Sequence, residues 1–182
     1  MRKITLTVLL LSALSFFAQA QEKTFSISGK IELDKGNLLV LTQRPGKIDT
    51  LAKTAIANRQ FSISGTTEEA VVAQLVIEGY AGGFVMILEP GEEYTANLTQ
   101  NGNGDIRGGK LQTAYNEYQK IVVNANAESR ALNKKASEAA AQKHFKTSKE
   151  LQTKANKVQE AAFAKMNNIV RKNADNVLAA YL

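Results

Sequence analysis

Short segments of alternating apolar and polar residues fill the first half of the chain. In FSISGKI at residues 25–31, the Phe and both Ile residues share one face of an extended segment, which is typical of a half-buried strand. The run AVVAQLVI at residues 70–77 is apolar on both faces, as in a central strand. With the segments between and after them, about seven strands are predicted, so we expect an antiparallel β-sandwich.

The pentapeptide FSISG occurs twice, at residues 25–29 and 61–65. The segments that follow the two copies differ, KIELDKGNLL against TTEEAVVAQL, and two copies fall short of the three that a repeat array needs. Each copy ends in a glycine, which we expect at a bend or bulge of a strand. The repeat therefore predicts architecture and not a binding motif. Pro90-Gly91 predicts a type II turn between two later strands.

From Lys110 onward the pattern changes to helical periodicity, without any proline. One stripe of large residues lies at i, i+4, i+7 and i+11, and a second stripe of six residues follows at similar spacing. The stripes consist of Leu111, Tyr115, Tyr118 and Val122, then Leu151, Ala155, Val158, Ala162, Met166 and Ile169. We expect two long helices in an antiparallel hairpin, and hence an α+β chain with a boundary after residue 109.

Two further start signals refine the helical half. Thr147 and Glu150 have the spacing of a capping box, which would restart the second helix after a break. A short third helix is expected at NVLAAYL, with Asn173 or Asp175 as its N-cap. The predicted organisation is therefore a β-sandwich domain at residues 21–109 and a helical extension at residues 110–182.

The first twenty residues predict a signal peptide. Arg2 and Lys3 precede an apolar run at residues 4–17, and the small residues of Ala18-Gln19-Ala20 follow it, which places cleavage after Ala20. The run is shorter than the roughly 20 residues that span a bilayer, although a retained membrane anchor stays open as the alternative. We expect an exported protein, located in the periplasm or associated with the outer membrane.

The net charge of +6 hides an asymmetry between the two halves. Residues 21–109 carry eight Lys and Arg against eleven Asp and Glu, whereas residues 110–182 carry thirteen against six. Glutamates are interspersed among the helical lysines and no aromatic platform accompanies them, so no nucleic-acid partner is predicted. Weak contact of the basic helices with an anionic surface is the minority interpretation.

No arrangement of residues predicts catalysis. The chain has no cysteine, which excludes thiol chemistry and cysteine metal sites. The single histidine, His144, lies in a basic helical context without a nucleophile or carboxylate partner. The pairs Glu68-Glu69 and Glu92-Glu93 would point to opposite sides of a strand, so we interpret them as solubilising charges.

One loop resembles the start of a calcium site without completing it. Asn101, Asn103 and Asp105 have the spacing of the first ligands. Ile106 stands where the loop needs a glycine, and Gln112 stands where it needs a bidentate glutamate. The sequence therefore predicts no catalytic, cofactor-binding or metal-binding residue, and no cofactor.

Four segments in order carry a family resemblance. FSISGKI with GNLLVL, then IDT with NRQFSISG, then GGFVMILEPGEEYTANL and finally IRGGKLQTAYNEYQ span residues 25 to about 118. They resemble an uncharacterised β-rich N-terminal domain, of the DUF4369-like type, from secreted bacterial thiol–disulfide oxidoreductases of the TlpA/ResA type. The later segment NADNVLAAYL is similar to the part that leads into the thioredoxin-like module of those proteins.

The resemblance implies a β-sandwich, a helical spacer and then a thioredoxin-like module with a Cys-x-x-Cys pair. This chain contains neither that module nor a cysteine, so no catalytic residue is carried over. Two hypotheses follow. The first is a non-catalytic envelope module that binds a protein or glycan partner, and the second is the front part of a thiol–disulfide interchange protein whose thioredoxin-like domain is missing.

Overall fold

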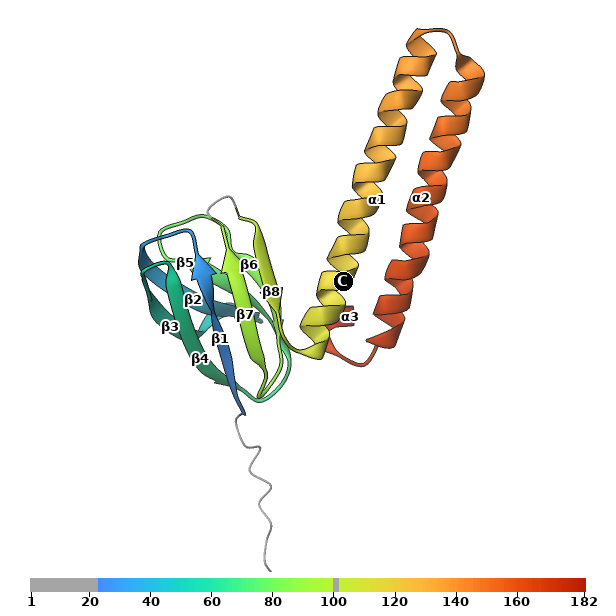
Figure 1. Cartoon of the computed structure of the whole chain (residues 1–182). Coiled ribbons are helices and arrows are strands. Elements are labelled where there is room, and N and C mark those ends of the chain that lie inside the picture. The colour runs from blue at the N-terminus through green and yellow to red at the C-terminus, as the bar shows by residue number, and fades with distance from the viewer. Residues whose placement is uncertain (1–22, 100–101) are drawn as a thin grey trace, which may run out of the picture.

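The computed structural model describes residues 23–99 and 102–182 and has the α+β class that the sequence predicts (Figure 1). The predicted signal peptide and its cleavage after Ala20 lie outside the described residues. The strands are β1 Lys23–Ile31, β2 Lys35–Arg44, β3 Lys47–Ala57, β4 Gln60–Thr67, β5 Val71–Ile77, β6 Phe84–Leu88, β7 Glu93–Leu98 and β8 Gly104–Arg107. The helices are α1 Lys110–Ala141, α2 Phe145–Lys172 and α3 Val177–Tyr181.

The strands form one mixed sheet of eight strands, whereas the sequence predicted an antiparallel sandwich of about seven. The order is β6-β5-β2-β3-β4-β1-β7-β8, and β1 pairs with β7 in parallel while the other pairs are antiparallel. The eighth strand, β8, has four residues and a single buried side chain, Ile106. Such a segment is too short to show an alternation, and the insertion of β1 between β4 and β7 is a long-range pairing that local patterns do not reveal.

The sheet curls until its two edge strands, β6 and β8, come close to each other. Phe84 begins β6, and a methyl group added at Gly104, the first residue of β8, would lie 2.6 Å from its ring. The inward side chains enclose one apolar core, and Phe25, Leu38, Val40, Leu75, Met86 and Leu88 within it are fully buried. The first half of the chain is thus a nearly closed barrel rather than two packed sheets.

The two FSISG copies pair with each other, which explains why the pentapeptide recurs. In the antiparallel β1–β4 ladder, Phe25 lies opposite Gly65 and Phe61 lies opposite Gly29. A methyl group at Gly65 would lie 2.7 Å from the Phe25 ring, and one at Gly29 would collide with the backbone of Ala96 on β7. Each glycine therefore leaves room for a neighbour. The expected architectural role is confirmed, although close approach rather than a bend requires the glycines.

A buried glutamine of α1 bridges the gap between the two edge strands. Gln112 is 1% exposed, and its Oε1 accepts a hydrogen bond from the Ile87 N–H of β6 at 2.8 Å. Its Nε2 donates to Asn116 Oδ1 at 2.8 Å, and Asn116 Nδ2 donates to the Ile106 carbonyl of β8 at 2.7 Å. We call this pair of side chains, Gln112 and Asn116, the amide clasp. It satisfies edge-strand backbone groups that would otherwise be buried without a partner.

A second set of contacts fixes the start of α1 against the barrel. The Glu89 carboxylate follows β6 and accepts a hydrogen bond from the Leu111 N–H in the first turn of α1 at 2.8 Å. The Glu89 N–H in turn donates to the Tyr94 hydroxyl of β7 at 2.8 Å. Gly109 precedes the helix with φ of 62°, and a side chain there would meet that carboxylate and that hydroxyl. The carboxylate also interacts favourably with the positive end of the helix dipole.

The two long helices pack through small residues. Apart from Gln112, which faces the barrel, the buried positions are Ala125, Ser129, Ala136 and Ala139 on α1, and Ser148, Ala155, Ala162 and the larger Ile169 on α2. Small side chains let the two helix backbones approach closely. The hairpin runs away from the barrel, and its turn lies at the far end (Figure 1). Among the helices in the described ranges, none is long and apolar enough to cross a membrane.

The expected hairpin and short third helix are present, but three local predictions need correction. The aromatic stripe at Tyr115 and Tyr118 is only half-buried, because the adjacent face with Gln112 and Ala125 carries the contacts. The second helix begins at Phe145 and not at a capping box at Thr147. The third helix is capped by Asn176, whose side chain accepts a hydrogen bond from the Leu178 N–H at 3.0 Å.

The close approach at Gly29 generates a stability prediction. Replacing Gly29 by Ala forces the β1 and β7 backbones apart, and we expect a loss of about 1–3 kcal/mol in the free energy of unfolding. Urea denaturation followed by circular dichroism measures this loss. Ser28→Ala is the matched control on the exposed face of the same strand, and an equal effect of the two substitutions would contradict the packing argument.

The amide clasp generates a second stability prediction. Gln112→Leu keeps most of the side-chain volume but leaves the Ile87 N–H without its acceptor, so we expect a loss of about 2 kcal/mol in unfolding free energy. Gln152→Leu, on the exposed face of α2, is the control. If both variants denature at the same urea concentration as the parent chain, the clasp contributes nothing to stability.

Candidate binding site

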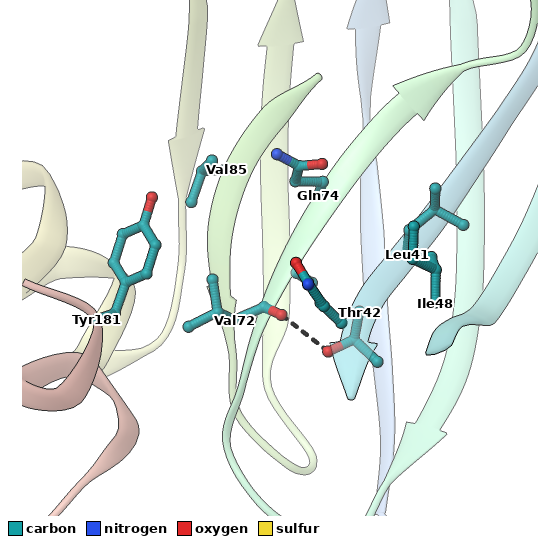
Figure 2. Close-up of a pocket in the computed structure, with 9 residues that line it drawn as sticks. Leu41, Thr42, Ile48, Val72, Gln74, Val85 and Tyr181 are labelled. Atoms are coloured by element: carbon teal, nitrogen blue, oxygen red, sulfur yellow. Dashed lines mark hydrogen bonds between the residues drawn. The ribbon is translucent and has the colours of Figure 1, made fainter. Parts of the chain in front are cut away.

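A cavity lies between the outer face of the sheet and the short helix α3. Its volume is about 400 Å³, and strands β2, β5 and β6 supply its floor while α3 supplies one wall (Figure 2). The residues that line it are Leu41, Thr42, Gln43, Ile48, Val72, Ala73, Gln74, Val85 and Tyr181. The site therefore depends on α3 being held against the barrel.

A second cavity of about 620 Å³ continues the first along α3. The two cavities share Thr42, Gln43 and Val72 in their linings. The second is bounded by the loops before β3 and β5 and by Asp175, Asn176 and Val177 at the start of α3. We call the combined feature the α3 groove. It runs beside α3 over the last residues of β2 and the first residues of β5.

The lining of the first cavity is aliphatic with a few directional polar groups. Leu41, Val72 and Val85 present half-buried apolar side chains, and Ile48 at the rim is 68% exposed. The Thr42 hydroxyl is already used, because it donates to the Val72 carbonyl at 2.9 Å (Figure 2). The Gln74 amide and the Tyr181 hydroxyl stand on the same cavity (Figure 2), so a ligand could form hydrogen bonds there.

Tyr181 is held in place by the helix that carries the amide clasp. Its ring lies 5.9 Å from the ring of Tyr115 on α1, at an interplanar angle of 59°. Leu178 on the same short helix is fully buried, and α3 contacts β5. Burial, together with the neighbouring Tyr181, raises the pKa of the Tyr115 hydroxyl to about 12. The groove wall is thus anchored on both α1 and the sheet.

The structure does not bring together the residues that the sequence offered as chemical candidates. His144 is exposed and precedes α2 at the turn of the hairpin, whereas Glu68 and Glu69 are exposed after β4. Asn101 lies outside the described residues, and Asp105 forms an exposed ion pair with Arg107 at 2.7 Å. Over residues 23–99 and 102–182, no group of three His, Asp or Glu side chains could hold a metal ion.

Sequence reasoning missed both the groove and the clasp. The run at residues 70–77 is apolar on both faces, and we interpreted it as a central strand. Its second apolar face is the outer face that α3 partly covers. Gln112 was considered only as a failed calcium ligand, although a glutamine beside Leu111 at the start of an apolar stripe was a visible polar exception. No local pattern shows that Tyr181 reaches β5.

Fold and groove together define a small α+β protein, in which a nearly closed eight-stranded sheet carries a helical hairpin at its edge and an apolar groove on its outer face. The family model described as a domain of unknown function, DUF4369, matches residues 25–115, half of the 182 residues, and the chain belongs to this family. The match covers the barrel from Phe25 onward and Gln112 of the amide clasp, and it ends within α1 at Tyr115, one residue before Asn116. No curated protein matches the chain.

The buried phenols generate a prediction about pH. Burial raises the pKa of Tyr94 and of Tyr115 to about 12, so the fold favours their neutral forms. The stability that they contribute is fully present below the ordinary tyrosine pKa of about 10 and is lost as pH rises from there to about 12. Ultraviolet difference absorbance should show a component from Tyr94 and Tyr115 that ionises only near pH 12.

Substituting each tyrosine in turn assigns the absorbance change near pH 12 to Tyr94 and Tyr115. Tyr94→Phe and Tyr115→Phe should each remove one tyrosine equivalent from it. An ionisation curve that is complete near the ordinary tyrosine pKa would contradict the burial of these two hydroxyls.

Proposed function

We propose that the protein is an exported, non-catalytic module of the cell envelope that binds a partner protein in the α3 groove. The observation that carries the proposal is the lining itself, which combines aliphatic side chains with the Gln74 amide and the Tyr181 hydroxyl. Such a surface buries apolar side chains of a ligand and orients its backbone through a few hydrogen bonds. The first cavity offers no nucleophile, general base or metal ligand among its side chains apart from hydroxyl groups.

A protein ligand suits this surface better than a glycan. Leu41, Val72, Val85 and Ile48 give an aliphatic floor and rim, and Tyr181 supplies the one aromatic ring among the described residues that line the first cavity, whereas a glycan site needs many hydrogen-bonding groups around its aromatic rings. A bound apolar segment would cover Ile48, which is 68% exposed without a partner. The Asp175 side of the groove would face the polar part of the same segment.

Site-specific photo-crosslinking in the producing cell tests the proposal. A photoreactive residue at position 74 lies in the groove, and the control position 152 lies on the exposed face of α2. We expect a discrete crosslinked partner from position 74 alone. Tyr181→Ala and Val85→Ser should each reduce that product by about tenfold, which corresponds to the loss of one buried side-chain contact. Equal crosslinking from both positions, or none that depends on Tyr181, would refute a binding role for the groove.

The absence of catalysis is tested separately. The purified chain from Gln21 to Leu182 should reduce or exchange insulin disulfides no faster than the buffer that contains the same thiol reductant. Any turnover above that background that persists through repeated purification would overturn the non-catalytic assignment.

The second candidate is the front part of a thiol–disulfide interchange protein. Its support is the resemblance at residues 25–118 and in NADNVLAAYL, together with the docking of that last segment as α3 beside the groove. A thioredoxin-like module after Leu182 would then begin next to the groove and could reach a bound partner. Coding sequence for Trp-Cys-x-x-Cys downstream of Leu182, in frame or frameshifted, would favour this candidate, and unrelated sequence would count against it.

A further inference from the structure

The positive charge of the helical half is concentrated in the part of the hairpin that lies farthest from the barrel. Residues 130–157, which contain the turn between α1 and α2, carry eight Lys and Arg against two Glu. The parts near the barrel have almost no net charge. Residues 110–129 contain two Lys and Arg against two Glu, and residues 158–182 contain three Lys and Arg against two Asp and Glu. We call residues 130–157 the hairpin tip (Figure 1). Its net charge of +6 equals that of the whole chain.

These basic side chains are not neutralised within the protein. Across residues 23–99 and 102–182, the ion pairs lie on the barrel and involve Arg44, Lys47, Lys53, Arg59 and Arg107. The lysines at the turn, Lys143, Lys146 and Lys149, are exposed. A surface of unpaired cations attracts an anionic partner whose charges are spread over an area.

An exposed aromatic side chain lies among these lysines. Phe145 is the first residue of α2 and is 69% exposed, between His144 and Lys146. A single exposed apolar residue needs no explanation by itself. Its position at the outermost point of a projecting hairpin, among lysines, is the arrangement by which peripheral proteins place an apolar side chain at the acyl boundary and lysines at the headgroups.

We propose that the hairpin tip docks on an anionic lipid bilayer, with Phe145 entering the interface and the surrounding lysines contacting lipid phosphates. A bilayer fits better than a nucleic acid, because base stacking needs successive aromatic side chains and the tip offers one. The turn at the end of the tip, after Ala141, lies roughly 45 Å along α1 from Gln112 at a rise of about 1.5 Å per residue. That distance is several Debye lengths of ~10 Å each. Acidic groups where α1 meets the barrel therefore do not repel an anionic surface at the turn.

Vesicle co-sedimentation tests the proposal with the chain from Gln21 to Leu182, which contains every described element. The probes are phosphatidylcholine vesicles with and without phosphatidylglycerol. We expect binding to the anionic vesicles alone, and its release by salt, because the attraction is electrostatic. Equal binding to neutral vesicles, or binding that high salt leaves unchanged, would overturn the proposal.

Charge-matched variants locate the contact. Substitution of Lys143, Lys146 and Lys149 by Gln should weaken binding on the order of 100-fold, at about 1 kcal/mol for each lysine near the surface. The control substitutes Lys120, Lys165 and Lys172 by Gln, which changes the net charge equally but lies near the barrel. We expect the control to lose less than about threefold. Equal losses would show non-specific attraction and would refute a docking site at the tip.

A second matched pair tests the aromatic side chain. Phe145→Ser should weaken vesicle binding by about tenfold, since one apolar side chain no longer enters the interface. Phe163→Ser, at a position that is 62% exposed on the shaft of α2, should leave it unchanged. Binding to single-stranded DNA that exceeds vesicle binding, and that is insensitive to Phe145→Ser, would assign the tip to nucleic acid and overturn the bilayer.

Discussion

The hydrogen bonds of one buried glutamine determine how the two halves of this protein meet. The Gln112 side chain of α1 accepts a hydrogen bond from the Ile87 N–H of the edge strand β6. It also donates to Asn116, whose side chain donates to the Ile106 carbonyl of the other edge strand, β8. A sheet that does not close by backbone pairing exposes polar groups at its edges. Here a helix covers the gap, so the barrel is completed by side-chain amides rather than by a ninth strand or a direct β6–β8 ladder.

The position of the groove follows from these hydrogen bonds between α1 and the barrel. Because the clasp fixes α1, it also fixes Tyr115, against which Tyr181 of α3 packs at 5.9 Å. The buried Leu178 holds the other side of α3. The groove wall therefore depends on a contact between Tyr115 and Tyr181, which are 66 positions apart in the sequence (181 − 115). The hairpin carries its exposed charges at the opposite end, so the groove and the hairpin tip would be able to bind different partners at the same time.

The sequence predicted the parts of the fold that local patterns encode. Alternation identified the strands at residues 25–31 and 70–77, and the periodicity after Lys110 identified the helices. The sequence did not predict β8, because four residues with one buried side chain show no period. It also did not predict the parallel pairing of β1 with β7. The candidate site was out of reach for the same reason, since Gln112, Tyr115 and Tyr181 acquire their roles from contacts that the chain order does not reveal.

Hydrogen exchange of the Ile87 backbone amide, measured by nuclear magnetic resonance, tests the central claim most directly. Ile87 lies on an edge strand, and an unpaired edge amide exchanges quickly through local fluctuation. If Gln112 accepts from it as described, the Ile87 amide should be protected to the same degree as amides of the central strand β2. Exchange as fast as that of an exposed loop amide, in the intact folded chain, would contradict the account.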